Sequence, residues 1–240
     1  MSQRFFSDSP ITAERAALDG PEAHHLLHVM RARVGDGVTL FDDSGAEFAA
    51  EIAACGRTEV QLRILERREI DRELPFELVV GVSLPKGDRQ KWLVEKLTEL
   101  GVTSLAPLVT ERGVAQPTAS ALDRLRRSVI EAAKQCGRNR LMKVAEPQAW
   151  ATYLSSESSA GPARRLVAHF GGISLTELDL DIRKAIQTNL AIGPEGGFAD
   201  QEVAAAVAAG WQIVDLGPRI LRVETAAIAL AAVVAASGRS

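Results

Sequence analysis

Two glycine-containing turns near the carboxyl end of the chain hold residue types that can bind a ligand and act on it. The first is GPEGG at 193–197, after the predicted strand 189–192, and the second lies within LGPRILRVETA at 216–226, at the end of the predicted short strand 213–216. Glycine lacks a Cβ and adopts positive φ, so a ligand can lie directly against the backbone. Because each turn follows a predicted strand, we expect a ligand crevice at the carboxyl edge of an open α/β sheet.

Absent motifs narrow the class of ligand. The chain has no G-x-x-x-x-G-K-[ST] segment for a nucleoside triphosphate, and no G-x-G-x-x-G segment in a dinucleotide-binding context. The GPEGG turn also contains no Lys or Arg, which argues against a phosphate-rich ligand. An uncharged heterocycle held by backbone hydrogen bonds fits better. The alternative is that GPEGG is only a tight turn.

These two turns and four earlier segments follow one another in the order of one known family. The earlier segments are Arg4-Phe5-Phe6, HHLLHVMR at 24–31, KWLVEKLTELGV at 91–102 and EAAKQCGR at 131–138. Together they resemble the ribosomal RNA small subunit methyltransferase E family, the uridine-N3 methyltransferases of the SPOUT superfamily. The resemblance covers nearly the whole chain with little inserted.

The resemblance implies an α/β fold, in which a SPOUT-type parallel sheet with a carboxyl-terminal trefoil knot follows a small PUA-like β-barrel. It implies methylation of N3 of a specific uridine in small-subunit (16S) ribosomal RNA, with S-adenosylmethionine as methyl donor. Two alternatives stay open: another SPOUT methyltransferase acting on a different RNA or atom, and a catalytically inactive RNA-binding or ribosome-assembly protein. The expected donor-binding residues are Leu84, His169, Gly171, Ile192, Gly193, Pro194, Glu195, Gly196, Gly197, Leu216, Gly217, Ile220, Leu221, Arg222, Thr225 and Ala226.

Methylation at N3 requires loss of the imide proton, so the site needs a group that favours the uridine anion and a group that accepts the proton. Arg222 is the expected anion-stabilising residue, and the carboxylates of Glu195 and Glu224 are the candidate proton acceptors. The alternative for Glu224 is to cap the last helix. The donor carries its own leaving group, so no metal is expected. His24, His25 and His28 lack a further ligand at a suitable spacing.

The distribution of charge bears on an RNA substrate, because the whole chain has a net charge of −3. Residues 1–72 carry 9 Lys and Arg against 13 Asp and Glu, whereas residues 84–143 carry 12 against 6. A local basic face can bind phosphates on an acidic chain, although it can also be only a solvated helix face. The expected RNA-binding residues are Arg4, Arg31, Arg33, Lys86, Arg89, Lys134, Arg138 and Arg219.

Two domains are predicted, 1–72 and 73–240, with the boundary in the charged stretch 67–75. In the first domain, short strands at 38–41, 47–54 and 59–66 and a helix at 22–30 are typical of a small barrel, for RNA contact or alternatively for dimerisation or stability. The second alternates strands at 76–83, 104–109, 164–169, 189–192 and 211–216 with helices at 91–100, 119–135, 200–209 and 226–236, so we expect a parallel sheet with helices on both faces. Residues 155–162 are predicted to be a flexible surface loop.

The remaining features concern location and assembly. The chain has no apolar run of 18 residues and no signal-peptide pattern, and Cys55 and Cys136 belong to no ligand motif. A cytoplasmic protein with reduced thiols and no membrane contact is therefore expected. The alanine-rich helix at 226–236 is apolar nearly all round, so we expect a partner helix to cover part of it in a homodimer.

Overall fold

The computed structural model describes residues 3–114, 116–155, 161–178 and 185–237. It divides into two compact units, of which unit 1 comprises 1–73 and 133–141, and unit 2 comprises 74–132 and 142–240. Residues 133–141, which the sequence pattern assigned to the second domain, thus cluster with the first unit. Most of the predicted surface loop, 156–160, lies outside the described residues.

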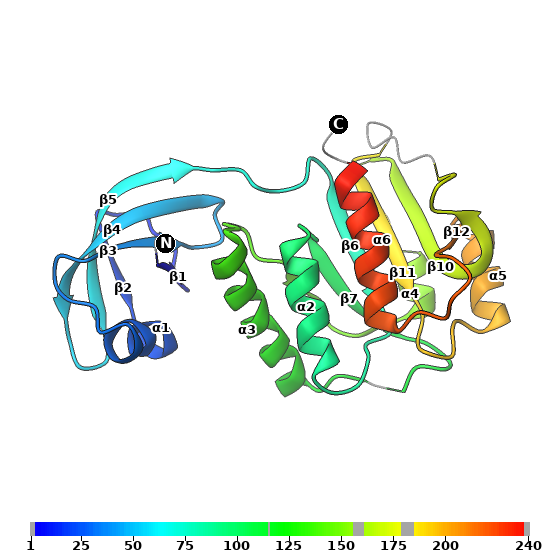
Figure 1. Ribbon diagram of the computed structural model, residues 1–240, viewed down its shortest axis with the longest axis horizontal. Coiled ribbons are helices and arrows are strands. Elements are labelled where there is room, and N and C mark those ends of the chain that lie inside the picture. Colours follow the sequence, from blue (N-terminus) through cyan, green and yellow to red (C-terminus); the bar gives the residue numbers. More distant parts are fainter. Residues whose placement is uncertain (1–2, 115, 156–160, 179–184, 238–240) are drawn as a thin grey trace. The chain divides into compact units, whose positions relative to one another are not determined.

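Unit 1 is built on a five-stranded sheet with the strand order β1-β3-β4-β5-β2. Its elements are β1 (Arg4–Phe6), β2 (Arg15–Leu18), the short helix α1 (Gly20–His24), one π-helical turn η1 (His25–Val29), β3 (Gly37–Phe41), β4 (Ala46–Cys55) and β5 (Val60–Glu69). The sheet curls around a buried core that includes Leu26 from η1, Phe48 and Ile52 (Figure 1). Within the residues described, the edge strands β1 and β2 do not pair with each other, so the predicted barrel is an open half-barrel.

Unit 2 contains a parallel sheet with the strand order β12-β10-β11-β6-β7-β8, and β9 also pairs with β7. Its strands are β6 (Glu77–Val82), β7 (Ser104–Val109), β8 (Lys143–Val144), β9 (Gln148–Ala149), β10 (Ala163–Ser174), β11 (Gln187–Ile192) and β12 (Gln212–Asp215). Its helices are α2 (Arg89–Glu99), α3 (Ala119–Cys136), α4 (Trp150–Leu154), α5 (Asp200–Ala208) and α6 (Val223–Ser237), of which α3 ends in unit 1. The predicted parallel sheet is confirmed.

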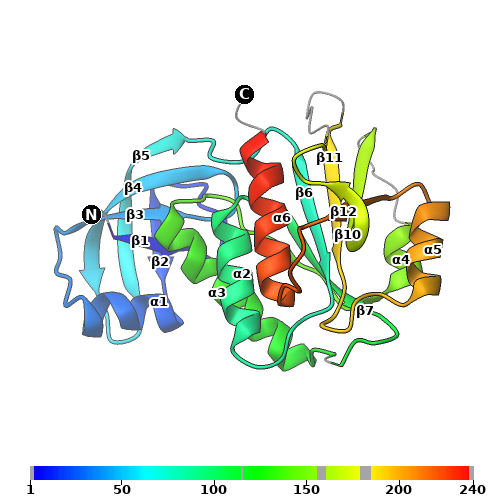
Figure 2. The ribbon, with the colours of Figure 1, turned by 45° about the vertical axis from the view of Figure 1, so that its right-hand side comes forward.

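Helices cover both faces of this sheet, as the alternating pattern predicts. Helices α2 and α6 pack on one face, and α4 and α5 pack on the other (Figure 1). Figure 2 shows the sheet between these two layers. After β12 at the edge of the sheet, the chain returns as α6 to β11 and β6 in its middle. The trefoil knot stays a prediction, since strand order does not decide it.

The close approach of α4 to the sheet depends on one glycine. The ring of Tyr153 lies so near Gly81 of β6 that a Cβ built on Gly81 would be 2.5 Å from ring carbon atoms. The Tyr153 hydroxyl donates a hydrogen bond to the Leu190 carbonyl oxygen of β11 at 2.8 Å. Trp150, Phe198 and Trp211 complete this aromatic core. The core therefore packs α4 against the end of β11, where the GPEGG turn begins.

Candidate active site

A cavity of about 320 Å³ lies at the carboxyl ends of β10, β11 and β12. Its volume is in the range of small-molecule sites. The lining residues are Arg112, Ala168, His169, Phe170, Ile192, Gly193, Pro194, Glu195, Gly196, Gly197, Phe198, Asp200, Asp215, Leu216, Gly217, Arg219, Ile220, Leu221, Val223 and Ala226. The two turns singled out in the sequence thus line one cavity.

The GPEGG turn is held in one conformation by local contacts. The amide of Gly197 donates to the Pro194 carbonyl oxygen at 2.8 Å, and Gly197 has a φ of +69°, which favours glycine. A Cβ at Gly193 would be 3.0 Å from the ring of the buried Phe198, so that position has little room. In the part of the chain that the structure describes, the amides of Glu195 and Gly196 donate to no protein acceptor. They are therefore available to a ligand.

The second turn is tied to β10 through Asp215, the last residue of β12. Its carboxylate accepts hydrogen bonds from the amides of Gly171, at 3.0 Å, and Gly217, at 2.8 Å. These two amides, with a smaller contribution from His169, lower the pKa of the Asp215 carboxyl below its usual value. Gly217 has a φ of +107°, and a Cβ there would meet open space. Asp215 therefore fixes the entry to the turn and remains charged beside the cavity.

Most of the expected donor-binding residues line this cavity, and four do not. Leu84 is buried, the amide of Gly171 serves Asp215, and Arg222 and Thr225 are exposed on the segment around the start of α6. Glu195, also proposed for catalysis, is among the lining residues, whereas Glu224 is not. The donor-binding set stays a prediction, and the shared cavity favours the part of it that belongs to the two turns.

The catalytic candidates differ in their surroundings. The guanidinium of Arg89 lies 3.7 Å from the carboxylate of Glu195 and 3.6 Å from that of Glu224, so it bridges the two. The side chain of Glu224 is 5% exposed, and its Oε2 is buried without a hydrogen-bond partner among the described residues. Arg222 is exposed, and within the described residues its guanidinium has no hydrogen bond or ion pair. Only Arg222 of these residues presents an unengaged charge.

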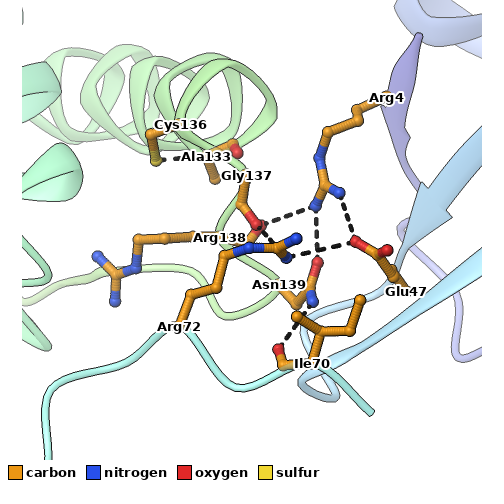
Figure 3. Close-up of polar contacts among 9 residues, drawn as sticks. All are labelled: Arg4, Glu47, Ile70, Arg72, Ala133, Cys136, Gly137, Arg138 and Asn139. Atoms are coloured by element: carbon orange, nitrogen blue, oxygen red, sulfur yellow. Dashed lines mark hydrogen bonds and ion pairs between the residues drawn. The ribbon is translucent and has the colours of Figure 1, made fainter. Parts of the chain in front are cut away.

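Three of the eight expected RNA-binding residues have buried charges within unit 1. Arg4 pairs with Glu47 at 2.8 Å and donates to the side-chain oxygen of Asn139 at 2.6 Å (Figure 3). Arg138 pairs with Glu73 at 2.5 Å. Lys134 pairs with Glu22 at 2.8 Å. Their side chains are 13%, 5% and 9% exposed, respectively. These ion pairs favour a structural role for the three residues and do not support a role in RNA contact.

Four of the five other basic candidates are accessible, and the fifth, Arg89, bridges Glu195 and Glu224. Arg31, Arg33, Lys86 and Arg219 are exposed, and Arg219 also lines the cavity. Arg31 has a φ of +54°, a conformation that is uncommon outside glycine and is often found at functional positions. Basic side chains near the cavity and on unit 1 are thus free to meet an anionic ligand.

Sequence reasoning missed several residues that line the cavity, among them the charged residues Asp215 and Arg112. Asp215 could have been found, because an acidic residue that ends a strand before Gly-Pro is a common acceptor for turn amides. Arg112 could not, because its contact with the GPEGG turn joins positions 84 residues apart. Ala168, Phe170, Phe198, Asp200 and Val223 also line the cavity without having been predicted.

The residues at the cavity fit S-adenosylmethionine. Ile192, Leu216 and Ile220 offer apolar contacts for a heterocycle, and unpaired turn amides offer hydrogen-bond donors. The carboxylates of Glu195 and Asp215 complement a cationic ligand. Among the residues described, no cluster of His, Cys, Asp and Glu has the arrangement of a metal site. No helix in the described ranges is sufficiently long and apolar to span a bilayer.

Comparison with known domains gives the class of the protein. A family model described as an RNA methyltransferase domain matches residues 72–235, which include the whole cavity. A second model, described as an RNA methyltransferase PUA domain, matches residues 18–65 in unit 1. The fold and the cavity therefore belong to an RNA methyltransferase with a PUA domain.

Similar proteins narrow this class. A ribosomal RNA small subunit methyltransferase E from Synechocystis is 36% identical over 85% of this chain and 67% of its own length. The structure of such an enzyme from Neisseria gonorrhoeae, bound to S-adenosyl methionine, has 30% identity and a TM-score of 0.86, covering 97% of this chain and 96% of that one. A Legionella pneumophila structure with the cofactor SAM has 28% identity and a TM-score of 0.90, covering 99% and 98%. The chain belongs to the ribosomal RNA small subunit methyltransferase E family.

Proposed function

We propose that this protein transfers a methyl group from S-adenosylmethionine to N3 of a specific uridine in 16S ribosomal RNA. The observation that carries the proposal is the single cavity formed by the GPEGG turn and the LGPRILRVETA segment. Family membership supports the RNA substrate, and two similar structures contain the donor. The uridine N3 position is the part that rests on the family resemblance alone.

The donor would be held by the two turns. The backbone of Gly193, Gly196 and Gly217 and the side chains of Ile192 and Leu216 form the walls of the cavity. When bound, S-adenosylmethionine supplies a methyl group attached to a sulfonium sulfur. Transfer of the methyl group leaves the rest of the donor as a neutral thioether. The walls exclude water and restrict the orientation of the ligand, which is how positioning lowers the barrier to transfer.

The acceptor nitrogen must lose its proton as the new N–C bond forms. Glu195 is the better placed proton acceptor, because its carboxylate lines the cavity and is exposed. Glu224 is buried behind its ion pair with Arg89, so it serves to position Arg89 at the N-terminus of α2. Arg222 would stabilise the negative charge that develops on the uracil ring, since its guanidinium is not neutralised by a neighbouring carboxylate.

RNA would contact the exposed basic residues Arg31 and Arg33 of unit 1 and Lys86 and Arg219 of unit 2. A ribosomal RNA substrate implies action in the cytoplasm.

We also infer a homodimer from the exposed side of α6. Although α2, β6 and β11 cover much of this helix, Thr225, Val233 and Ala236 remain exposed, and Ala229 and Ala232 are half-buried.

Replacement of Gly196 tests the donor site. A Cβ at Gly196 meets only Arg112, at 3.5 Å or more, so Gly196→Val should fold while its branched side chain occupies ligand space. We expect calorimetry to detect S-adenosylmethionine binding to the wild type and not to Gly196→Val. Gly37→Val is the matched control, because Gly37 begins β3 in unit 1 and a Cβ there meets nothing within 4 Å. Unchanged donor affinity in folded Gly196→Val would remove the GPEGG turn from the site.

A further inference from the structure

Arg112 joins the loop after β7 to the GPEGG turn. Its Nη1 donates to the Gly196 carbonyl oxygen at 3.0 Å and to the Phe198 carbonyl oxygen at 3.4 Å. Hydrogen bonds from a charged donor are stronger than those between neutral groups. The side chain also lines the cavity. One guanidinium therefore holds two carbonyl groups of the segment that forms one wall of the cavity.

A second contact keeps the loop that carries Arg112 in place. Glu202, in the first turn of α5, is buried, and its Oε1 accepts a hydrogen bond from the Glu111 amide at 2.9 Å. Its Oε2 accepts from the Ala199 amide at 2.8 Å. One carboxylate thus ties the residue before Arg112 to the start of the helix after the turn. The loop after β7 is therefore joined to the segment 196–202 at two points, by the guanidinium of Arg112 and by the carboxylate of Glu202.

The consequence for the turn is that the peptide between Gly196 and Gly197 is held from both ends. Its carbonyl oxygen accepts from Arg112, and its amide donates to the Pro194 carbonyl oxygen. Two adjacent glycines have the greatest backbone freedom of any residue pair, so an ordered conformation needs such restraints. Loss of Arg112 would leave this peptide with the single bond to Pro194.

We propose that Arg112 is a positioning residue for the donor cavity, which it shapes by fixing the Pro194–Gly197 turn. The inference rests on the proposed function, since it assigns the cavity to S-adenosylmethionine. Arg112 acts on the ligand through the backbone of the turn, and it does not bind the amino-acid part of the donor. It therefore contributes to the affinity of every ligand that occupies the cavity, with or without an amino-acid part.

The test compares Arg112→Met, Arg112→Lys and the wild type with two ligands. Calorimetry would measure S-adenosylmethionine and 5′-methylthioadenosine, which lacks the amino-acid part. Arg112→Met should weaken both ligands by the same factor, about tenfold, the effect of losing a hydrogen bond to a charged group. Arg112→Lys, which keeps one donor group, should recover part of the affinity. Mass spectrometry should show faster hydrogen exchange in residues 193–199 of ligand-free Arg112→Met.

Arg124→Met is the matched control, because Arg124 is an exposed residue of α3 whose guanidinium has no ion pair within the described residues. It should change neither ligand affinity nor exchange at 193–199. If Arg112→Met weakens only S-adenosylmethionine, Arg112 binds the amino-acid part and the inference is wrong. Unchanged binding of both ligands, or lost RNA affinity with unchanged donor affinity, also overturns it. If the wild type binds neither ligand, the proposed function itself fails.

Discussion

Arg89 and Arg222 have the same side chain and different electrostatic surroundings. Arg89 bridges the carboxylates of Glu195 and Glu224 at 3.7 and 3.6 Å, so most of its charge is compensated within the protein. Arg222 is exposed and, within the described residues, its guanidinium pairs with no carboxylate. A catalytic cation must be free to interact with charge that appears only in the transition state. Arg222 meets that requirement better than Arg89.

Replacement of Arg222 should lower turnover and leave binding unchanged. Arg222→Ala should cost on the order of a hundredfold in the single-turnover rate, as expected for loss of one group that stabilises a developing anion. Arg222→Lys should restore part of the rate, because an ammonium lacks the planar fork of donors. Higher pH should partly rescue Arg222→Ala, since uridine then ionises without help. A loss of donor affinity in proportion to the rate would instead make Arg222 a binding residue.

At the scale of elements, local periodicity predicts the strands and helices that form the site, and long-range contacts account for what it missed. The strand expected at 164–169 is β10, which extends to Ser174 because its pairing with β12 shifts register after Ala168. Helix α6 begins at Val223, one turn before the expected start at residue 226. The strands β8 and β9 have two residues each and no periodicity to detect. Both turns were predictable, since glycine and proline mark them directly.

The packing of α4 on β6 and β11 makes an element-scale prediction for alkaline pH. Tyr153 is the only tyrosine in the chain, and burial raises the pKa of its phenol well above the usual range. The folded state therefore keeps the proton, and the unfolded chain releases it with a pKa of about 10. The free energy of unfolding should fall as pH rises above about 10.

Absorbance of the phenolate and near-ultraviolet circular dichroism, followed in one alkaline titration, check this prediction. Trp150 and Trp211 lie beside Tyr153 and report on its packing. Phenolate should form only as the circular dichroism signal of these two tryptophans is lost. Tyr153→Phe serves as the control that removes the titrating hydroxyl. Phenolate formation near pH 10 with intact tertiary signal would show that solvent reaches the ring in the folded state.

At the scale of the whole molecule, unit 1 is not one continuous stretch of the sequence, so a single boundary cannot separate it from unit 2. Residues 133–141 belong to unit 1, through contacts that no local pattern reveals. Asn139 accepts from Arg4, and its amide nitrogen donates to the Ile70 carbonyl oxygen at 3.1 Å (Figure 3). Arg72 donates to the Gly137 carbonyl oxygen at 2.9 Å. The EAAKQCGR segment, read from sequence as part of the catalytic domain, therefore ends in unit 1.

The central claim is methyl transfer to N3 of uridine in small-subunit ribosomal RNA, and mass mapping of the product tests it most directly. Purified protein and S-adenosylmethionine would be incubated with unmodified small-subunit RNA, as free RNA and as assembled subunits. The account predicts 3-methyluridine at a single position, dependent on the donor and absent with Gly196→Val. Methylation of a ribose oxygen or of another base, or no product from either form of the RNA, would contradict it.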